Sequence, residues 1–117
     1  MVHRALEVAD LLEQNSVKVG VVDLYRLKPI NIPALLECIG GTKRVVTLEE
    51  HILTGGMGSM VLTALMEREF FVPVLRLGIS DQHCYFYSNS RDSVQRHFQL
   101  DQDSIINKVN HWINNVK

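Results

Sequence analysis

The chain has 117 residues, 46% of them hydrophobic, and a formal net charge of −1, which is typical of one globular domain, residues 1–117, with its own core. The balanced charge argues against a nucleic-acid partner or an anionic membrane surface, and no apolar run approaches the roughly 20 residues of a membrane span. Glu7 and Asp10 interrupt any signal peptide, and Cys38 and Cys84 are too few for a disulfide scaffold, so we expect a cytoplasmic protein with free thiols.

The first half of the chain alternates helical and extended patterns. Apolar residues at helical spacing predict a helix over residues 2–14, and a valine-rich run predicts a strand over residues 17–24. Asn31 can cap a short helix that reaches Ile39, where two glycines end it. A second β-branched run, residues 44–48, predicts the next strand.

The second half continues the alternation. We expect a helix from the glycine loop to about residue 69, a strand over 72–77, a loop over 82–89, a short helix opened by Ser90 and a last helix capped by Asp101. Tyr85, Phe86 and Tyr87 fall in that loop and either pack on a partner or cover the end of their own sheet. Helices alternating with strands predict an α/β fold, a three-layer α/β/α sandwich with a mainly parallel sheet.

The stretch that combines most features runs from the second strand into the following helix. Glu49, Glu50 and His51 fall at the carboxyl end of the strand, where open α/β sheets place their sites, and could form an acid–base group. Gly55, Gly56 and Gly58 then lead into the helix, whose free N–H groups could hold an anion. The same residues could instead order the loop, allow close helix–sheet packing or form a subunit interface, and we favour packing because neither a dinucleotide nor a P-loop fingerprint is complete.

Three segments carry a resemblance to a known family. The run T-L-E-E-H-x-x-x-G-G-M-G-S, residues 47–59, resembles the signature of the transketolase C-terminal domain, which closes transketolases, deoxyxylulose-phosphate synthases and the beta subunits of 2-oxo-acid dehydrogenases. Residues 21–30 and residues 77–81, which end in Asp81, resemble two further family segments in the same order. Ser80 and His83 depart from the family pattern, which has proline and phenylalanine there, and Gln99 stands where glycine is frequent.

The resemblance implies a part of an enzyme. In the family, thiamine diphosphate and a divalent metal such as Mg are held by two other domains, so we expect no cofactor, metal or catalytic residue in this chain. The expected partners are the remaining transketolase domains or a subunit that carries them, together with a second copy in a homodimer. The family also has strands before the first helix, so we expect a truncated domain with about three strands, whose unpaired edges would pair with a second copy or within the chain.

The resulting hypothesis is a C-terminal domain for assembly or regulation in an enzyme that transfers two-carbon ketol or acyl units, inactive alone. The alternatives are a small phosphate- or nucleotide-binding module at the glycine loop, or a dimerisation module. The candidate anion-binding or interface residues are Glu49, Glu50, His51, Gly55, Gly56, Gly58 and Asp81.

Overall fold

The computed structural model of the protein describes residues 1–82, 86 and 90–115. The elements are α1 (Val2–Gln14), α2 (Ile32–Ile39), β1 (Val45–Ile52), α3 (Met57–Glu67), β2 (Val74–Ile79), α4 (Arg91–His97) and α5 (Gln102–Asn115). β1 and β2 form a two-stranded parallel sheet, with Val45 opposite Val74 and Leu48 opposite Leu77. α3 connects the two strands, because parallel neighbours need a crossover.

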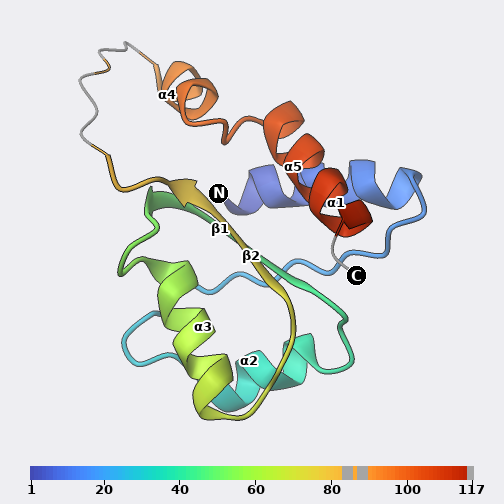
Figure 1. The fold of residues 1–117 in the computed structure, drawn as a ribbon, viewed down its shortest axis with the longest axis vertical. Coiled ribbons are helices and arrows are strands. Elements are labelled where there is room, and N and C mark those ends of the chain that lie inside the picture. Colours follow the sequence, from blue (N-terminus) through green and yellow to red (C-terminus); the bar gives the residue numbers. More distant parts are fainter. Residues whose placement is uncertain (83–85, 87–89, 116–117) are drawn as a thin grey trace.

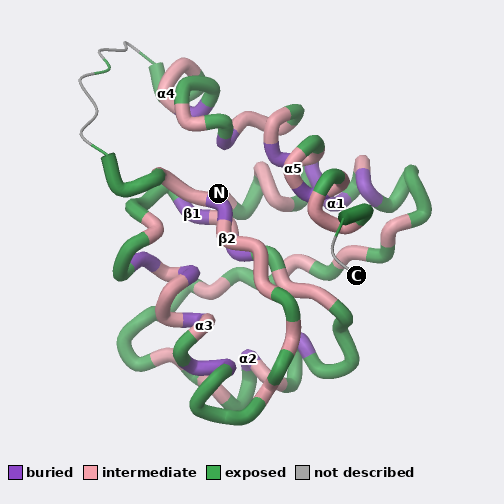
Figure 2. Tube along the Cα trace, viewed as in Figure 1, coloured by how far each residue is buried: buried purple, intermediate pink, exposed green. Residues whose placement is uncertain are grey.

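Helices cover both faces of the strands. Figure 1 shows α1, α4 and α5 on one side and α2 and α3 on the other. Each side has its own apolar cluster: Val8, Leu12, Leu77, Leu100, Ile105 and Val109 on the first, and Leu35, Ile39, Val61 and Leu65 on the second. Figure 2 shows the buried residues distributed over both helical layers and the strands. The α/β fold with helices on both faces is therefore as the sequence predicts.

Side-chain caps fix three of the helix starts. The Asn31 side chain accepts a hydrogen bond from the Ala34 N–H at 3.2 Å, and the Ser90 hydroxyl does the same for α4. Asp101 accepts from both the backbone N–H and the hydroxyl of Ser104 at the start of α5. Burial alone would raise the pKa of Asp101, but the bonds from Ser104 outweigh it and hold that pKa below its ordinary value. These three starts confirm the predicted helix boundaries.

The predicted strand over residues 17–24 is wrong for the described structure. The backbone is extended there (Figure 1), but residues 18–29 form no backbone–backbone hydrogen bond with any described residue. A strand is defined by a hydrogen-bonded neighbour, and β1 has its single neighbour in β2. The valine pattern thus predicts the extended backbone correctly and the pairing incorrectly, and the sheet has two strands instead of three.

The other differences are shifts of boundary. β1 extends to Ile52, so Glu49, Glu50 and His51 lie within the strand and not behind it. β2 begins at Val74, two residues later than predicted, and Pro73 stays outside, where its carbonyl accepts a hydrogen bond from the Val45 N–H at 3.0 Å.

The predicted aromatic loop lies largely outside the described residues, with Tyr85 and Tyr87 among those not described. Phe86 stacks on the His97 ring of α4, with ring centroids 4.2 Å apart. The loop was expected either to pack on a partner or to cover the end of its own sheet. Phe86, the one residue of the three aromatics that the structure describes, packs against the chain itself.

Candidate functional site

The Glu49 side chain joins the end of β1 to the start of α3. It is 6% exposed. Its carboxylate accepts hydrogen bonds from the backbone N–H groups of Met57 at 2.6 Å and Gly58 at 2.9 Å. These are two of the N–H groups that a helix start leaves without a partner, and a negative charge there is favoured by the helix dipole. Glu49 therefore takes the position at the helix start that a bound phosphate would occupy, and an external anion would have to displace it.

The glycines around Glu49 leave room for its side chain. A Cβ at Gly56 would collide with the Glu49 carboxylate and the Ile52 carbonyl. A Cβ at Gly58 would lie 2.9 Å from the Glu49 Oε1 atom, and one at Gly78 would lie 2.9 Å from its Cγ atom. Gly55 has a positive φ of 72°, the region that glycine adopts without strain. This loop is thus shaped around a carboxylate that belongs to the protein.

Arg76 on β2 also contacts the loop after β1 and the start of α3. Its guanidinium donates to the Leu53 carbonyl at 3.2 Å and to the Ser59 hydroxyl at 2.8 Å, and Ser59 in turn donates to the Leu53 carbonyl at 2.6 Å. These contacts tie β2, the loop after β1 and the first turn of α3 together.

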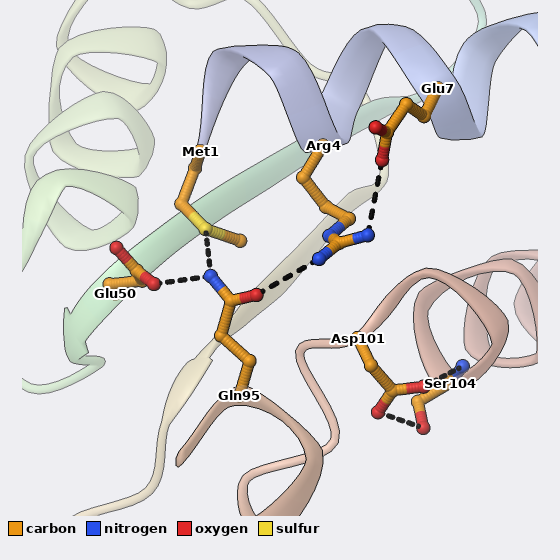
Figure 3. A network of polar contacts seen from close by, with 7 residues as sticks. All are labelled: Met1, Arg4, Glu7, Glu50, Gln95, Asp101 and Ser104. Carbon is orange, nitrogen blue, oxygen red and sulfur yellow. Dashed lines mark hydrogen bonds and ion pairs between the residues drawn. The ribbon is translucent and has the colours of Figure 1, made fainter. Parts of the chain in front are cut away.

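Glu50 points to the opposite side of β1 and holds α4. Arg91 donates to both of its carboxylate oxygens, at 2.9 and 2.6 Å, and Gln95 donates to one of them. Figure 3 shows Gln95 at the centre of this network, where it also donates to the Met1 sulfur and accepts from Arg4. The hydrogen bonds from Arg91 lower the pKa of Glu50, against the opposing effect of burial, and Glu50 raises the pKa of Arg91.

His51, Gly55 and Asp81 are exposed, and none of them is hydrogen-bonded through a side chain to Glu49 or Glu50 in the described structure. Glu49, Glu50 and His51 therefore do not form one acid–base group: the first is buried against α3, the second faces α4 and the third faces solvent. No three His, Cys, Asp or Glu side chains in the described part of the chain are arranged to hold a metal ion. No described helix is long and apolar enough to cross a membrane.

Sequence reasoning overlooked Arg76, Ser59, Arg91 and Gln95. Arg76, Arg91 and Gln95 lie far in sequence from the residues they contact; Gln95, for example, lies 45 residues from Glu50. The sequence offers only one local signal among them, the position of Ser59 directly after Gly58 at the start of the helix.

The α/β fold and the glycine loop between β1 and α3 together point to one family of domains. The profile of the family "Transketolase, C-terminal domain" matches residues 1–105, and the chain belongs to this family. Its relatives include 1-deoxy-D-xylulose-5-phosphate synthases. That of Thermosynechococcus vestitus is 43% identical over 81 residues, and that of Caldanaerobacter subterraneus is 30% identical over 109 residues, or 93% of this chain. These matches span only 13% and 17% of the two relatives.

A solved structure has the same architecture. The chain superposes on a split-gene transketolase, in an inactive beta4 tetramer, with a TM-score of 0.81 and 34% sequence identity. The match covers 94% of this chain and 35% of that one. The chain is therefore similar to part of several longer enzymes.

The cofactor of the family does not fit the described residues. A diphosphate needs free N–H donors or cations, and the N–H groups of Met57 and Gly58 are bonded to Glu49. The described residues also bring no three His, Cys, Asp or Glu side chains together around one point. No catalytic step through thiamine diphosphate can therefore be assigned to this chain's own residues.

Proposed function

We propose that this chain is the C-terminal assembly domain of a thiamine-diphosphate-dependent, transketolase-like enzyme, and that it is inactive without the other domains. The observation that carries the proposal is the transketolase C-terminal-domain profile, which matches residues 1–105. The 0.81 TM-score to part of a split-gene transketolase supports it. The other domains, on the same polypeptide or on a separate subunit, would hold thiamine diphosphate and Mg.

The complete enzyme would transfer a two-carbon ketol or acyl unit in carbohydrate metabolism. Support for this comes from the relatives, which are 1-deoxy-D-xylulose-5-phosphate synthases. We also propose a homodimeric enzyme in the cytoplasm. The exposed free thiol of Cys38 suits a reducing compartment.

Within that assembly, the end of β1 would serve as an interface. Glu49 and the glycines Gly56 and Gly58 hold the loop and the start of α3 in one geometry through the bonds to Met57 and Gly58. The exposed His51, Ile52 and Gly55, together with Glu50 and Asp81, would then face a neighbouring domain. A phosphate- or nucleotide-binding module is less well supported, because Glu49 already bonds the N–H groups that such a ligand would use.

A chimera tests the proposal directly. The matching segment of the Thermosynechococcus vestitus synthase would be replaced by this chain, and synthase activity compared with that of the synthase lacking the segment. We expect the shortened synthase to be inactive and the chimera to regain measurable activity, since the two segments belong to one family and are 43% identical over 81 residues. A folded chimera without activity would contradict the proposal.

Glu49→Ala in the chimera provides the matched control, because it removes the carboxylate that orders α3 while leaving every exposed interface residue in place.

Calorimetric titration of the 117-residue chain separates the assembly domain from the phosphate- or nucleotide-binding module. With thiamine diphosphate plus Mg, and separately with nucleotides, we expect no heat of binding. Saturable heat with a nucleotide would favour the binding module over the assembly domain.

A further inference from the structure

α4 is held in place mainly by polar contacts. It has seven residues, and isolated helices shorter than about 12 residues are marginal in water, so contacts with other elements must stabilise it. Gln95 is its only buried residue. Val94, its one aliphatic residue, is partly exposed. The helix itself therefore contributes no buried apolar side chain to the core.

The contact between α4 and β1 lies at the first residue of the helix. Arg91 donates to both carboxylate oxygens of Glu50, at 2.9 and 2.6 Å. The Arg91 side chain is 66% exposed and that of Glu50 is 33% exposed, so water and salt reach the pair. A cation at a helix start lies against the positive end of the helix dipole, where it is unfavourable for the helix. Arg91 therefore stabilises the docking of α4 on β1 and not the helix itself.

The opposite end of α4 is anchored in the core. Phe98 packs on the apolar cluster on the α1 and α5 side of the sheet, and Leu100 in that cluster is 2% exposed. The Leu100 N–H donates to the Gln95 carbonyl at 2.7 Å, and the chain turns at Gln99, whose φ is 55°. α4 is thus fixed at its end by apolar packing and at its start by an exposed ion pair.

Side chains do not fill the space between α1 and α4. A cavity of about 130 Å³ lies there, and its lining includes His3, Arg4, Arg91 and Asp92. Arg4 donates to the Gln95 side-chain oxygen at 3.1 Å (Figure 3). Because dispersion contacts are lost wherever a gap separates two surfaces, this face of α4 gains little from packing against α1.

We infer that α4 is a strap, hinged at residues 98–100 and held closed by the Glu50–Arg91 pair, that opens from the carboxyl end of β1 while the remaining helices stay folded. Opening exposes Gln95, which is 5% exposed in the closed strap, and frees the Glu50 carboxylate. The carboxyl end of β1 is the surface that the proposed function assigns to a neighbouring domain, so the strap would control the access of that domain to Glu50. Only this use of the opening rests on the proposed function.

Hydrogen exchange of the 117-residue chain measures the opening. The reporters are the amides of residues 94–97, which bond back along α4, as the Val94 N–H does to the Ser90 carbonyl at 3.3 Å. In low salt, Arg91→Gln should speed their exchange at least about threefold, with no change in α3, the internal reference for a folded chain. Fraying of α4 by itself predicts the opposite, because removing a cation from a helix start stabilises the helix. Unchanged or slowed exchange in Arg91→Gln would overturn the inference.

Arg96→Gln is the matched control, because it removes the same charge from an exposed position in the last turn of the same helix. A cation there favours the helix, so fraying predicts a larger effect from Arg96→Gln than from Arg91→Gln, and the strap predicts a smaller one. Glu50→Gln should speed exchange about as much as Arg91→Gln, and the double variant little further, because both substitutions remove one contact. Fully additive effects would count against a strap held by this pair.

Salt provides a second measurement on the unaltered chain. Raising sodium chloride from about 0.02 to about 0.5 M screens an exposed pair, so it should speed the exchange of residues 94–97 in the wild type and not in Arg91→Gln. A wild type without this response would contradict the strap. Because these experiments contain no cofactor and no other domain, faster exchange together with an inactive chimera would refute the proposed function and leave the strap standing.

Discussion

The two sides of β1 differ in how completely their polar groups are satisfied. At its carboxyl end, the buried Glu49 bonds two amides of α3, and Arg76 and Ser59 bond the loop carbonyl of Leu53. Along the edge away from β2, backbone groups and residues 18–24 have no described partner. The first region is held by side chains of the chain itself, whereas the backbone groups of the second have no backbone partner among the described residues. The start of α3 is therefore ordered by contacts within the chain, and substitutions there should cost more stability than substitutions in residues 18–24.

The largest effect is expected from Glu49→Ala. It leaves the buried amides of Met57 and Gly58 without an acceptor, at about 1–3 kcal/mol per group, so we expect a loss of about 3 kcal/mol in the free energy of unfolding. Urea denaturation followed by circular dichroism measures it. Glu49→Gln, which keeps one acceptor oxygen, should lose about half as much. Glu13→Ala on the exposed face of α1 should change stability by less than about 0.5 kcal/mol. A Glu49→Ala variant as stable as the wild type would show that Glu49 does not hold the start of α3.

Proline substitutions compare the paired and unpaired backbone directly. Val45→Pro removes the N–H that bonds to Pro73 at 3.0 Å and should cost about 2 kcal/mol. Val21→Pro, in the segment without backbone bonds, removes no bond and follows a glycine, so it should cost less than about 1 kcal/mol. Equal losses in urea denaturation would mean that residues 18–24 are paired in solution.

Gly58→Ala should have a smaller effect, because two terms oppose each other. The new Cβ would press on the Thr47 hydroxyl and the Glu49 carboxylate, which costs about 1–3 kcal/mol, while alanine gains up to about 1 kcal/mol of helix propensity. We expect a net loss of about 1 kcal/mol in thermal or urea denaturation. Gly20→Ala is the matched control, since nothing lies within 4 Å of its added Cβ, and it should be neutral or slightly stabilising. A stabilised Gly58→Ala variant would show that the loop accommodates a Cβ atom beside Thr47 and Glu49 without strain.

The difference between the two regions also explains what could be predicted from sequence. Helix starts at Asn31, Ser90 and Asp101 were predictable because a cap and its helix are adjacent in the chain. The glycine loop was recognisable for the same reason. The pairing of residues 17–24 could not be read from their valines, since pairing depends on a neighbour elsewhere. Nor could the partners of Glu50 be read, because Arg91 lies 41 residues away.

The smallest effect is expected at Glu50, which is partly exposed and bonds the exposed Arg91. Arg91 lowers the pKa of Glu50, so the stabilising contribution is fully present above the ordinary glutamate pKa of about 4.3 and is lost as the pH falls through the lowered pKa. Glu50→Gln should therefore be slightly less stable than the wild type at pH 7 and equal to it near pH 2, in thermal denaturation across that range. The difference should shrink in high salt, because exposed ion pairs are screened, and it should disappear in an Arg91→Gln background. A difference that persists at pH 2 would mean that Glu50 acts through packing with Gln95 and Met1 and not through its charge. Loss of this contact would loosen α4 without disturbing Glu49, because the two side chains project to opposite sides of β1.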